Sequence, residues 1–278
     1  MRTVMKKLDG FILAAGLGTR MGVLSRALPK PAWTLNGRSL LTLGADAMRK
    51  AGLRCLACNA HHLPERLKEA ADDLEFCLEP VLLGSSGGLS HAQGRATDPL
   101  AVWNGDALAE IPWASFIAQH QCRGAELSWL LVPHPGGPWN PVWLDDQGRV
   151  LPKDERGKGP YHFTGASLWS SKAMALIPEG PSDTKSDILP CITHHAGIVV
   201  EAFPWIEIGT PDQLIEAARL LAPGAEGRIP GCYVHPSAEP TGHLRHCVLG
   251  PGAKPLAEED ADALWFEEGG RQVRLPFG

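Results

Sequence analysis

The sequence predicts an α/β fold built on a mainly parallel, doubly wound sheet. Short apolar runs alternate with segments of helical periodicity, and polar or glycine-rich segments follow several of the apolar runs directly. An uninterrupted apolar run such as Phe11–Ala15 is typical of a strand that is covered on both faces. Open sheets of this class bind ligands beyond the carboxyl ends of their strands, so the segments that follow the strands are the candidate functional positions.

The elements are expected in the following order. Strands are expected at residues 11–15, 53–58, 74–77, 100–103, 127–132 and 163–169. Helices are expected at residues 40–51, 64–71, 89–93, 111–121 and 211–221, and a hairpin at 141–151 that turns at 146–148. The helix at 40–51 is supported by apolar residues at helical spacing and by Gly52 as a stop signal.

The composition changes after residue 222. Residues 223–231 have the proline and glycine content of a linker, and residues 234–238 and 248–253 resemble rungs of a left-handed β-helix. We therefore predict a main domain at 1–222 and a short β-rich tail at 223–278. Because two rungs bury little core by themselves, the tail is expected to pack on the main domain or on a second copy of the chain, as a homo-oligomer.

The bulk composition limits the partners of the protein. A net charge of −5 over 278 residues gives no general attraction to nucleic acid or to an anionic membrane. No apolar run is long enough to span a bilayer, and the amino terminus lacks a signal-peptide pattern, so a cytoplasmic location is expected. Seven cysteines, an odd number, indicate reduced thiols. Cys55 and Cys58 would point to opposite faces of a strand, which argues against a zinc site there.

The segment after the first strand has the properties of an anion site. Gly16 and Gly18 allow backbone N–H groups to approach an anion closely, and Arg20 adds a permanently charged side chain. Lys30 lies between two prolines, which restrict where its ammonium group can reach. A dinucleotide fingerprint would need a third glycine at Met21, and the Gly-Lys-Ser/Thr of a P-loop is missing. The pattern predicts polyphosphate binding, with an ordinary strand-to-helix turn as the alternative.

A second candidate position follows the strand at 100–103. Asp106 comes directly after Asn104-Gly105, which places a carboxylate at a strand end. Magnesium prefers few carboxylates together with phosphate oxygens and water, so this arrangement suits that metal. Asn-Gly-Asp is also good turn chemistry, and an ordinary turn is the alternative.

Four segments in order resemble the motifs of the sugar-1-phosphate nucleotidyltransferases. They are Ala14-Ala-Gly-Leu-Gly-Thr-Arg-Met with Pro29-Lys-Pro31, Glu79-Pro-Val-Leu-Leu-Gly-Ser-Ser-Gly-Gly-Leu89, Val102-Trp-Asn-Gly-Asp106, and Trp205-Ile-Glu-Ile-Gly-Thr-Pro211. Within that family the chain looks most like uridylyltransferases for N-acetylmuramate 1-phosphate and like mannose-1-phosphate guanylyltransferases. The resemblance implies a three-layer, Rossmann-like (GT-A-like) domain that transfers NMP from an NTP to a sugar 1-phosphate. UTP or GTP is favoured, and the product would supply cell-envelope polysaccharide.

The resemblance also implies a role for individual residues. Arg20, Lys30 and Asp106 would be catalytic, and Asp106 with Glu207 would hold Mg²⁺, with Mn²⁺ as a substitute. The nucleotide would be contacted by Leu13, Ala14, Ala15, Gly16, Gly18, Thr19, Glu79, Gly84, Gly87 and Gly88. The sugar phosphate would be contacted by Asn140, Lys153, Thr164 and Gly165, with Lys158 competing with Lys153 for the phosphate.

Some positions depart from the family pattern. Glu207 stands where the pattern has an aspartate, and Asn140-Pro141 replaces a glycine-containing sugar loop. Glu79 is either an acceptor for a base N–H group or a surface charge. Two alternatives therefore stay open: a catalytically weakened nucleotide-sugar binding or regulatory subunit, and a cytidylyltransferase-type enzyme that acts on a non-sugar phosphate.

Overall fold

The computed structural model describes residues 7–71, 73–137, 139–152, 154–201 and 205–277. The chain divides into two compact units, and each is assembled from segments that are distant in the sequence. Unit 1 comprises Met1–Ala15, Gly44–Asn59 and Leu74–Trp205, and unit 2 comprises Gly16–Leu43, Ala60–Asp73 and Ile206–Gly278.

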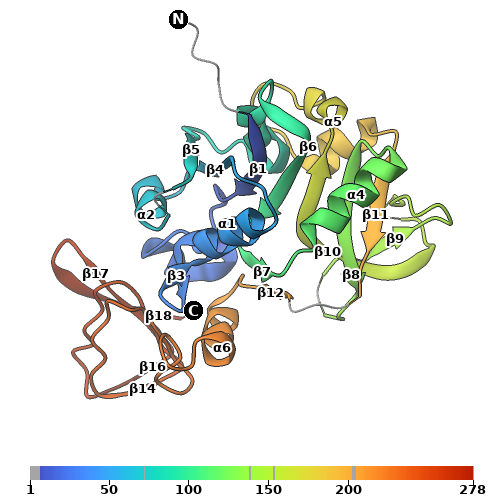
Figure 1. Ribbon diagram of the computed structural model, residues 1–278. Coiled ribbons are helices and arrows are strands. Elements are labelled where there is room, and N and C mark those ends of the chain that lie inside the picture. Colours follow the sequence, from blue (N-terminus) through green and yellow to red (C-terminus); the bar gives the residue numbers. More distant parts are fainter. Residues whose placement is uncertain (1–6, 72, 138, 153, 202–204, 278) are drawn as a thin grey trace, which may run out of the picture. The chain divides into compact units, whose positions relative to one another are not determined.

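Unit 1 is built on an eight-stranded sheet (Figure 1). Its strands, in spatial order, are β11 (His195–Val199), β8 (Leu127–Pro133), β10 (Lys158–Trp169), β6 (Ala96–Asn104), β1 (Leu8–Leu13), β4 (Leu56–Ala60) and β5 (Glu75–Leu78), and β9 (Val142–Leu144) pairs with β10. Strands β4, β1 and β6 run parallel, as do β11 and β8, whereas β10 is antiparallel to both β6 and β8. The sheet is therefore mainly parallel, as predicted.

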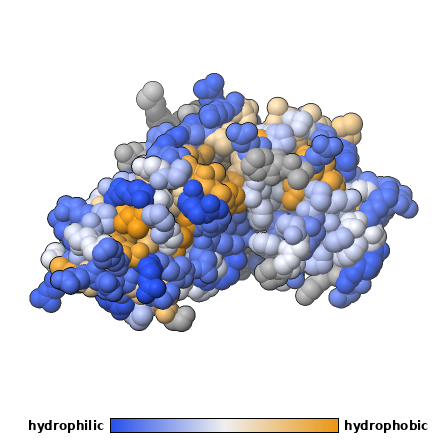
Figure 2. Space-filling view, turned by 90° about the horizontal axis from the view of Figure 1, so that it is seen from below, coloured by the Kyte–Doolittle hydropathy of each residue, from blue (hydrophilic) through white to orange (hydrophobic). Residues whose placement is uncertain are grey.

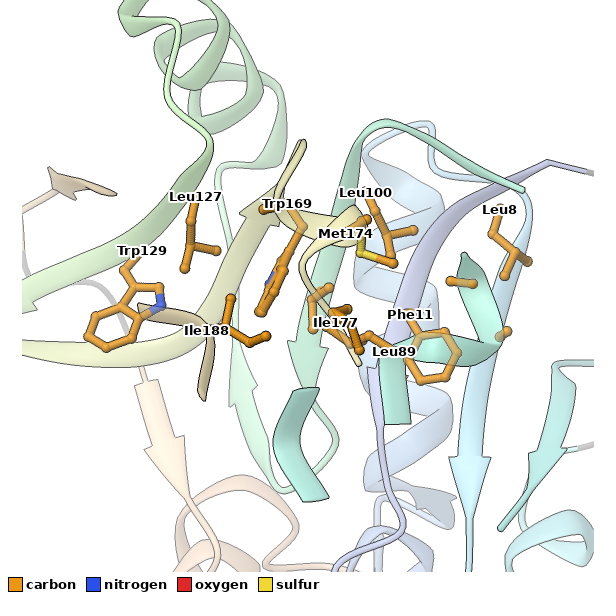
Figure 3. Close-up of a cluster of buried hydrophobic side chains, with 14 of the residues drawn as sticks. Leu8, Phe11, Leu89, Leu100, Leu127, Trp129, Trp169, Met174, Ile177 and Ile188 are labelled. Atoms are coloured by element: carbon orange, nitrogen blue, oxygen red, sulfur yellow. The ribbon is translucent and has the colours of Figure 1, made fainter. Parts of the chain in front are cut away.

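Both faces of this sheet are covered, which explains the uninterrupted apolar runs. On one face, α1 (Leu40–Lys50) contributes Gly44, where an added Cβ would lie 3.0 Å from the Trp103 ring. On the same face, Trp113 of α4 (Trp113–Arg123) meets Trp103 edge to face at 6.4 Å. The other face carries the core that Figure 3 shows, in which Phe11, Trp129 and Trp169 pack with residues of the short helices α5 (Ser171–Ala175) and η4 (Thr184–Ile188).

Several strand bounds differ from the prediction. The first strand begins at Leu8 and ends at Leu13, so Ala14 and Ala15 already belong to the following loop. Strand β10 begins at Lys158, ahead of the expected Phe163, and includes Gly159 and Pro160, which usually interrupt a strand. Strand β11 was not predicted at all. The remaining elements of unit 1 are α3 (Gly84–Gly87), η3 (Gly88–Ala92), β7 (Ala107–Ala109) and η5 (Leu189–Cys191).

Unit 2 combines the segment after β1 with the carboxyl-terminal part of the chain. It holds η1 (Thr19–Arg26), η2 (Lys30–Ala32), the hairpin of β2 (Thr34–Leu35) and β3 (Arg38–Ser39), α2 (Pro64–Glu69) and α6 (Pro211–Leu221), and β12 (Trp205–Glu207) ends in it. Helix α6 has the predicted bounds because Thr210 caps it, its Oγ1 accepting from the Gln213 N–H at 3.3 Å, and Pro211 follows at the first helical position.

The carboxyl-terminal strands stack in parallel, as the two predicted rungs implied. Strands β13 (Tyr233–Val234), β15 (Val248–Leu249) and β17 (Ala263–Glu268) pair in register, so a third stacked strand follows the two predicted rungs. Strands β14 (His243–Arg245) and β16 (Glu259–Ala261) also pair in parallel, and β18 (Arg271–Pro276) closes the array against β17. Their inward side chains form a small core that includes Cys232, Cys247 and Trp265.

An imidazole on this array joins two carboxylates. The Nδ1 atom of His246 lies 2.7 Å from Asp262 Oδ1, and its Nε2 atom lies 2.6 Å from Asp212 Oδ1 at the start of α6. The ring also meets Phe277 edge on, at 5.4 Å. The hydrogen bonds to Asp262 and Asp212 raise the pKa of His246 above its ordinary value.

This raised pKa predicts how stability depends on pH. The protonated imidazole stabilises the fold below the unfolded-state pKa of about 6.5, and this stabilisation is lost as the pH rises through the higher folded-state pKa. We expect the Tm difference between the wild type and His246→Asn to be about 1–2 °C at pH 6, because the group is half exposed, and to shrink by pH 9. Thermal unfolding of both proteins at the two pH values measures it. An equal difference at both would contradict the assignment.

The described part of the chain contains no helix that is long and apolar enough to cross a membrane. The face drawn in Figure 2 is largely hydrophilic, with smaller apolar areas between polar ones. All seven cysteines are free thiols, in agreement with the sequence-based expectation. Burial raises the pKa of the Cys58 thiol, which lies within β4.

Candidate active site

The glycine loop and the two predicted cations lie in unit 2. Gly18 adopts a left-handed conformation with φ 64°, and a Cβ added there would lie 3.5 Å from the Cβ of Lys30. The loop and the lysine are therefore adjacent, although nine residues, which include most of η1, separate Arg20 from Lys30 in the sequence. Lys30 is 8% exposed and forms the first residue of η2, with Pro29 before it in extended conformation.

Arg20 forms an ion pair with Glu207 in the same unit. The Arg20 side chain is 60% exposed and that of Glu207 is 14% exposed, so the guanidinium group keeps a solvent-facing side. Gly209 leaves room for it, since an added Cβ would lie 3.0 Å from the Arg20 guanidinium group. Arg20, which is predicted to bind pyrophosphate, and Glu207, which is predicted to bind the metal, therefore contact each other directly. Five N–H donors allow an arginine to hold a carboxylate and a phosphate together.

The start of the loop after β1, at Ala14, belongs to unit 1 and is held there by a series of buried hydrogen bonds. The Ala14 N–H donates to Asn59 Oδ1 at 2.7 Å, and the Asn59 amide donates to Glu79 Oε1 at 2.8 Å. Glu79 Oε2 accepts from the Leu83 N–H at 3.0 Å. Glu79 is 1% exposed, so the interpretation of it as a surface charge is wrong. It links the end of β1 to the glycine-rich segment, and its contact with a base stays a prediction.

The glycine-rich segment is helical, whereas we expected an irregular stretch before a helix. Residues Gly84–Gly87 form α3 and Gly88–Ala92 form η3. A Cβ at Gly84 would lie 2.5 Å from the Ser182 carbonyl oxygen, and one at Gly87 would lie 2.7 Å from that of Gly180. The N–H groups of Ser86 and Gly87 both donate to Ser182. The protein's own backbone therefore requires two of the glycines that the sequence assigned to the nucleotide.

A substitution at Gly88 tests how much the buried hydrogen bonds of Asn59 and Glu79 contribute to the stability of the protein. Its added Cβ would overlap the Asn59 amide and lie 2.9 Å from Glu79 Oε1. We expect Gly88→Ala to destabilise the protein by about 1–3 kcal/mol through overpacking, which thermal unfolding would measure as a lower Tm. Gly224→Ala is the matched control, because an added Cβ there meets nothing within 4 Å. An unchanged Tm in Gly88→Ala would show that the Asn59–Glu79 bond is not needed.

Asp106 follows the end of β6 in unit 1. The preceding turn is tied to β1, because the Gly105 N–H donates to the Leu13 carbonyl at 3.0 Å. Asn104 packs against Gly165, where an added Cβ would lie 3.1 Å from the asparagine side chain and where φ is 93°. Two predicted site segments, one after β6 and one within β10, are thus in contact. Asp106 itself is partly exposed.

The other predicted acceptor residues are placed differently. Thr164 is 1% exposed, its hydroxyl donates to the Leu130 carbonyl at 3.0 Å, and its carbonyl accepts from Trp205 Nε1 at 2.9 Å. Lys158 is exposed and lies 3.2 Å from Asp146. Lys153 lies outside the described residues. Asn140 is exposed and lines a cavity of about 1070 Å³ beside β8, β10 and β11.

Aromatic side chains to which the sequence analysis assigned no role line this cavity or contact residues that line it. Trp139 and His162 line it, and their ring centroids are 5.5 Å apart. Trp205 lies 4.7 Å from His162, and Phe163 stacks on Trp129 at 4.7 Å. His195 also lines the cavity, and burial lowers its pKa to about 3, so this imidazole is neutral. The nine tryptophans of the sequence were the signal that could have pointed to an aromatic cavity.

A metal-binding cluster made of protein groups alone is missing from the described residues, where no three His, Cys, Asp or Glu side chains gather. Magnesium does not require such a cluster, because it takes few carboxylates and completes its octahedral shell with phosphate and water oxygens.

Comparison with known proteins relates this geometry to a family. A family model described as "MobA-like NTP transferase domain" matches residues 10–160. A probable mannose-1-phosphate guanylyltransferase 1 of Oryza sativa subsp. japonica is 24% identical over 242 residues, covering 80% of this chain and 67% of the relative. The mannose-1-phosphate guanylyltransferase of Mycobacterium tuberculosis is 23% identical over 265 residues, covering 89% and 71%. The chain spans 64% to 67% of the length of four of the plant and Dictyostelium relatives.

Solved structures show the same fold. HddC from Yersinia pseudotuberculosis has a TM-score of 0.66 and 22% identity, and the match covers 77% of this chain and 99% of that one. The inositol-1-phosphate CTP transferase from T. maritima has a TM-score of 0.62 and 15% identity, covering 78% and 95%. The predicted three-layer, Rossmann-like fold is confirmed. Since the family model matches more than half of its residues, the chain belongs to the MobA-like NTP transferase domain family.

Proposed function

We propose that the protein transfers a nucleoside monophosphate from an NTP to a sugar 1-phosphate and releases pyrophosphate. The observation that carries this proposal is the packing of the buried residue Lys30 beside Gly18, which brings a cationic residue to a glycine loop that Arg20 follows closely in the sequence. Two cations and the backbone N–H groups of a glycine loop suit a triphosphate. The relatives, which are named mannose-1-phosphate guanylyltransferases, support a sugar 1-phosphate as the acceptor.

In the proposed reaction, a phosphate oxygen of the acceptor attacks the α-phosphorus in line, the P–O–P bond breaks, and pyrophosphate leaves. Arg20 holds the leaving pyrophosphate, and Lys30 neutralises charge that develops on the α-phosphate oxygens. Such a reaction needs positioning and charge stabilisation more than proton transfer. Arg20 also forms an ion pair with Glu207, and the five N–H donors of an arginine allow one guanidinium group to hold a carboxylate and a phosphate together.

The chemistry of the donor set fits a divalent cation. Asp106 and Glu207 each offer carboxylate oxygens, the ligand type that Mg²⁺ prefers, and Mn²⁺ accepts the same ligands. We propose these two residues as its protein ligands. When bound, the metal would offset phosphate charge as a Lewis acid. Glu207 is one methylene longer than the aspartate of the family pattern, so its arm reaches Arg20 as well.

On the acceptor side we propose contacts from Asn140 and from the backbone of Thr164 and Gly165, since the Thr164 hydroxyl is bonded within the sheet. Lys153 and Lys158 remain alternatives for the acceptor phosphate, and Lys158 would have to release Asp146. For the base we propose UTP or GTP, read by the segment Gly84–Gly88 and by the loop Leu13–Thr19.

The wider setting is also part of the proposal. We place the reaction in the cytoplasm, in nucleotide-sugar synthesis for cell-envelope polysaccharide. The division at residues 222 and 223, and self-association through the carboxyl-terminal strands, are proposals of the same kind.

Pyrophosphate release tests the function directly. The purified protein is incubated with Mg²⁺ and each NTP, crossed with glucose, mannose, N-acetylmuramate and inositol 1-phosphates and with phosphocholine. We expect release with one NTP and one sugar 1-phosphate. Release with a non-sugar phosphate alone would replace the sugar in the proposal. Nucleotide binding without release from any pair would instead support a regulatory subunit.

A further inference from the structure

A buried carboxylate lies in the segment that the sequence presents as a linker. Glu226 follows α6 in a stretch rich in glycine and proline, yet it is fully buried. Its Oε1 atom accepts from the Thr34 hydroxyl at 2.9 Å and from the Gly37 N–H at 2.9 Å, and its Oε2 atom accepts from the Asn36 N–H at 3.0 Å. Three donors from one hairpin therefore satisfy this buried anion.

The hairpin that Glu226 binds has a demanding turn. Asn36 and Gly37 both have positive φ, at 53° and 70°, which is the two-residue turn that Asn-Gly favours. In this turn two successive N–H groups point toward one carboxylate. The Asn36 amide also donates to the carbonyl of Leu221, the last residue of α6, at 2.9 Å. The carboxyl-terminal segment thus fixes the hairpin from two sides.

Tyr233 adds a second attachment at the start of the same hairpin. Its hydroxyl lies 2.9 Å from the Thr34 hydroxyl and accepts from the Thr34 N–H at 3.3 Å. Burial raises the pKa of Tyr233, so the phenol stays protonated. Because the Thr34 hydroxyl donates its proton to Glu226, the phenol is the donor in its bond to Thr34. Its ring meets the fully buried Trp33 edge to face at 5.3 Å. Gly250 on the next turn also approaches Trp33, at 3.5 Å for an added Cβ.

These attachments lie next to Lys30 in the chain. Helix η2 starts at Lys30 and ends at Ala32, so Trp33 and Thr34 are the residues that follow it. The Trp33 N–H donates to the Lys30 carbonyl at 3.4 Å, which closes the turn that presents the lysine. Pro29 and Pro31 limit its backbone on either side. The position of the Lys30 backbone is therefore set by Trp33 and Thr34, and these are set by Glu226 and Tyr233.

We propose that Glu226 and Tyr233 are positioning residues for Lys30, so that the carboxyl-terminal segment is a working part of the active site. This inference rests on the proposed function, in which Lys30 stabilises the transition state. A small displacement of such a group costs rate and leaves substrate binding largely intact. Loss of the attachments should therefore reduce kcat and change KM little.

The test uses Glu226→Gln and Tyr233→Phe in the full chain. In Glu226→Gln an amide NH₂ replaces one oxygen and faces the hairpin donors, whereas Tyr233→Phe removes one hydroxyl and keeps the ring on Trp33. We expect kcat to fall on the order of tenfold in Glu226→Gln and less in Tyr233→Phe, with KM for the NTP within about twofold. Glu239→Gln, which alters an exposed carboxylate of the same segment, is the matched control and should keep wild-type kcat.

A double variant separates positioning from general stability. If Glu226 acts through Lys30, then Lys30→Ala/Glu226→Gln should be no slower than Lys30→Ala alone. Additive losses would overturn the inference, as would wild-type kcat in Glu226→Gln and Tyr233→Phe. If Glu226→Gln does not fold, Tyr233→Phe and its double variant with Lys30→Ala decide the question.

The reactivity of Lys30 provides a readout that does not depend on turnover. Limited acetylation of the folded proteins, followed by peptide mass spectrometry, compares Lys30 with exposed lysines. We expect the rate of acetylation at Lys30 to change in Glu226→Gln and the rate of acetylation at Lys172 to stay the same. An unchanged rate at Lys30 would overturn the positioning role. Wild-type turnover in Lys30→Ala would instead contradict the proposed function, whatever the acetylation rates are.

Discussion

Replacing Lys30 by alanine should lower kcat on the order of a hundredfold or more while the protein stays folded. The Cβ atom of Lys30 packs beside Gly18 and the residue is 8% exposed, so its charge should act on a bound phosphate with little screening by water. Its contribution grows as negative charge develops on the α-phosphate oxygens, so the loss should appear mainly in kcat. Steady-state pyrophosphate release, with the substrate pair found above, measures it.

Two variants serve as controls for this experiment. Lys172→Ala removes an exposed lysine of α5 and should leave kcat unchanged. Lys30→Arg keeps the charge but not the compact ammonium group, so a partial recovery is expected. Wild-type kcat in Lys30→Ala would contradict the assignment of the lysine. A loss confined to KM would mean that it binds the ground state and the transition state equally.

Replacing Asp106 by asparagine should lower kcat by a similar factor, on the order of a hundredfold. The substitution conserves size and turn chemistry but removes the charge that a divalent cation needs, so the turn after β6 should survive. A titration of kcat against Mg²⁺ and Mn²⁺ should show weaker metal dependence in the variant. Glu110→Gln, an exposed carboxylate in the same stretch of chain, is the control.

The alternative for Asp106 is a structural turn residue, and it makes the opposite prediction. In that case Asp106→Asn would change Tm and leave the metal titration as in the wild type. Equal metal dependence in the two proteins would therefore remove Asp106 from the metal site.

Much of the fold could be predicted because local signals agreed with tertiary packing. Helix α6 has Thr210 as its cap, Pro211 as its first residue and an amphipathic pattern, so its bounds were predicted correctly. Strand β11 was missed, because it is short, starts with His195 and contains Gly197. The start of β10 was missed for a related reason, since Gly159 and Pro160 are read locally as a turn.

The site was predicted less completely, because sequence patterns do not show what a backbone approaches. The glycines at 84 and 87 were assigned to a base, but Ser182 and Gly180, nearly a hundred residues away in the sequence, already require them. Asn59 connects Ala14 to Glu79 through side-chain contacts that have no local signal. Glu226 was hidden in the same way, since a turn-rich segment is usually exposed. The Arg20, Lys30 and Asp106 motifs can be recognised in the sequence because their chemistry is local, and the roles of these residues stay predictions.

The segmented make-up of unit 2 has a consequence for biosynthesis. Residues Gly16–Leu43 are translated well before their partners in Ile206–Gly278. A nascent chain that ends before residue 226 therefore contains Lys30 and its turn without Glu226 or Tyr233, while the eight-stranded sheet of unit 1 has all its strands by residue 199. Catalytic competence should consequently arise only after Tyr233 has been translated, so that translation products truncated before residue 226 should have little nucleotidyl-transfer activity.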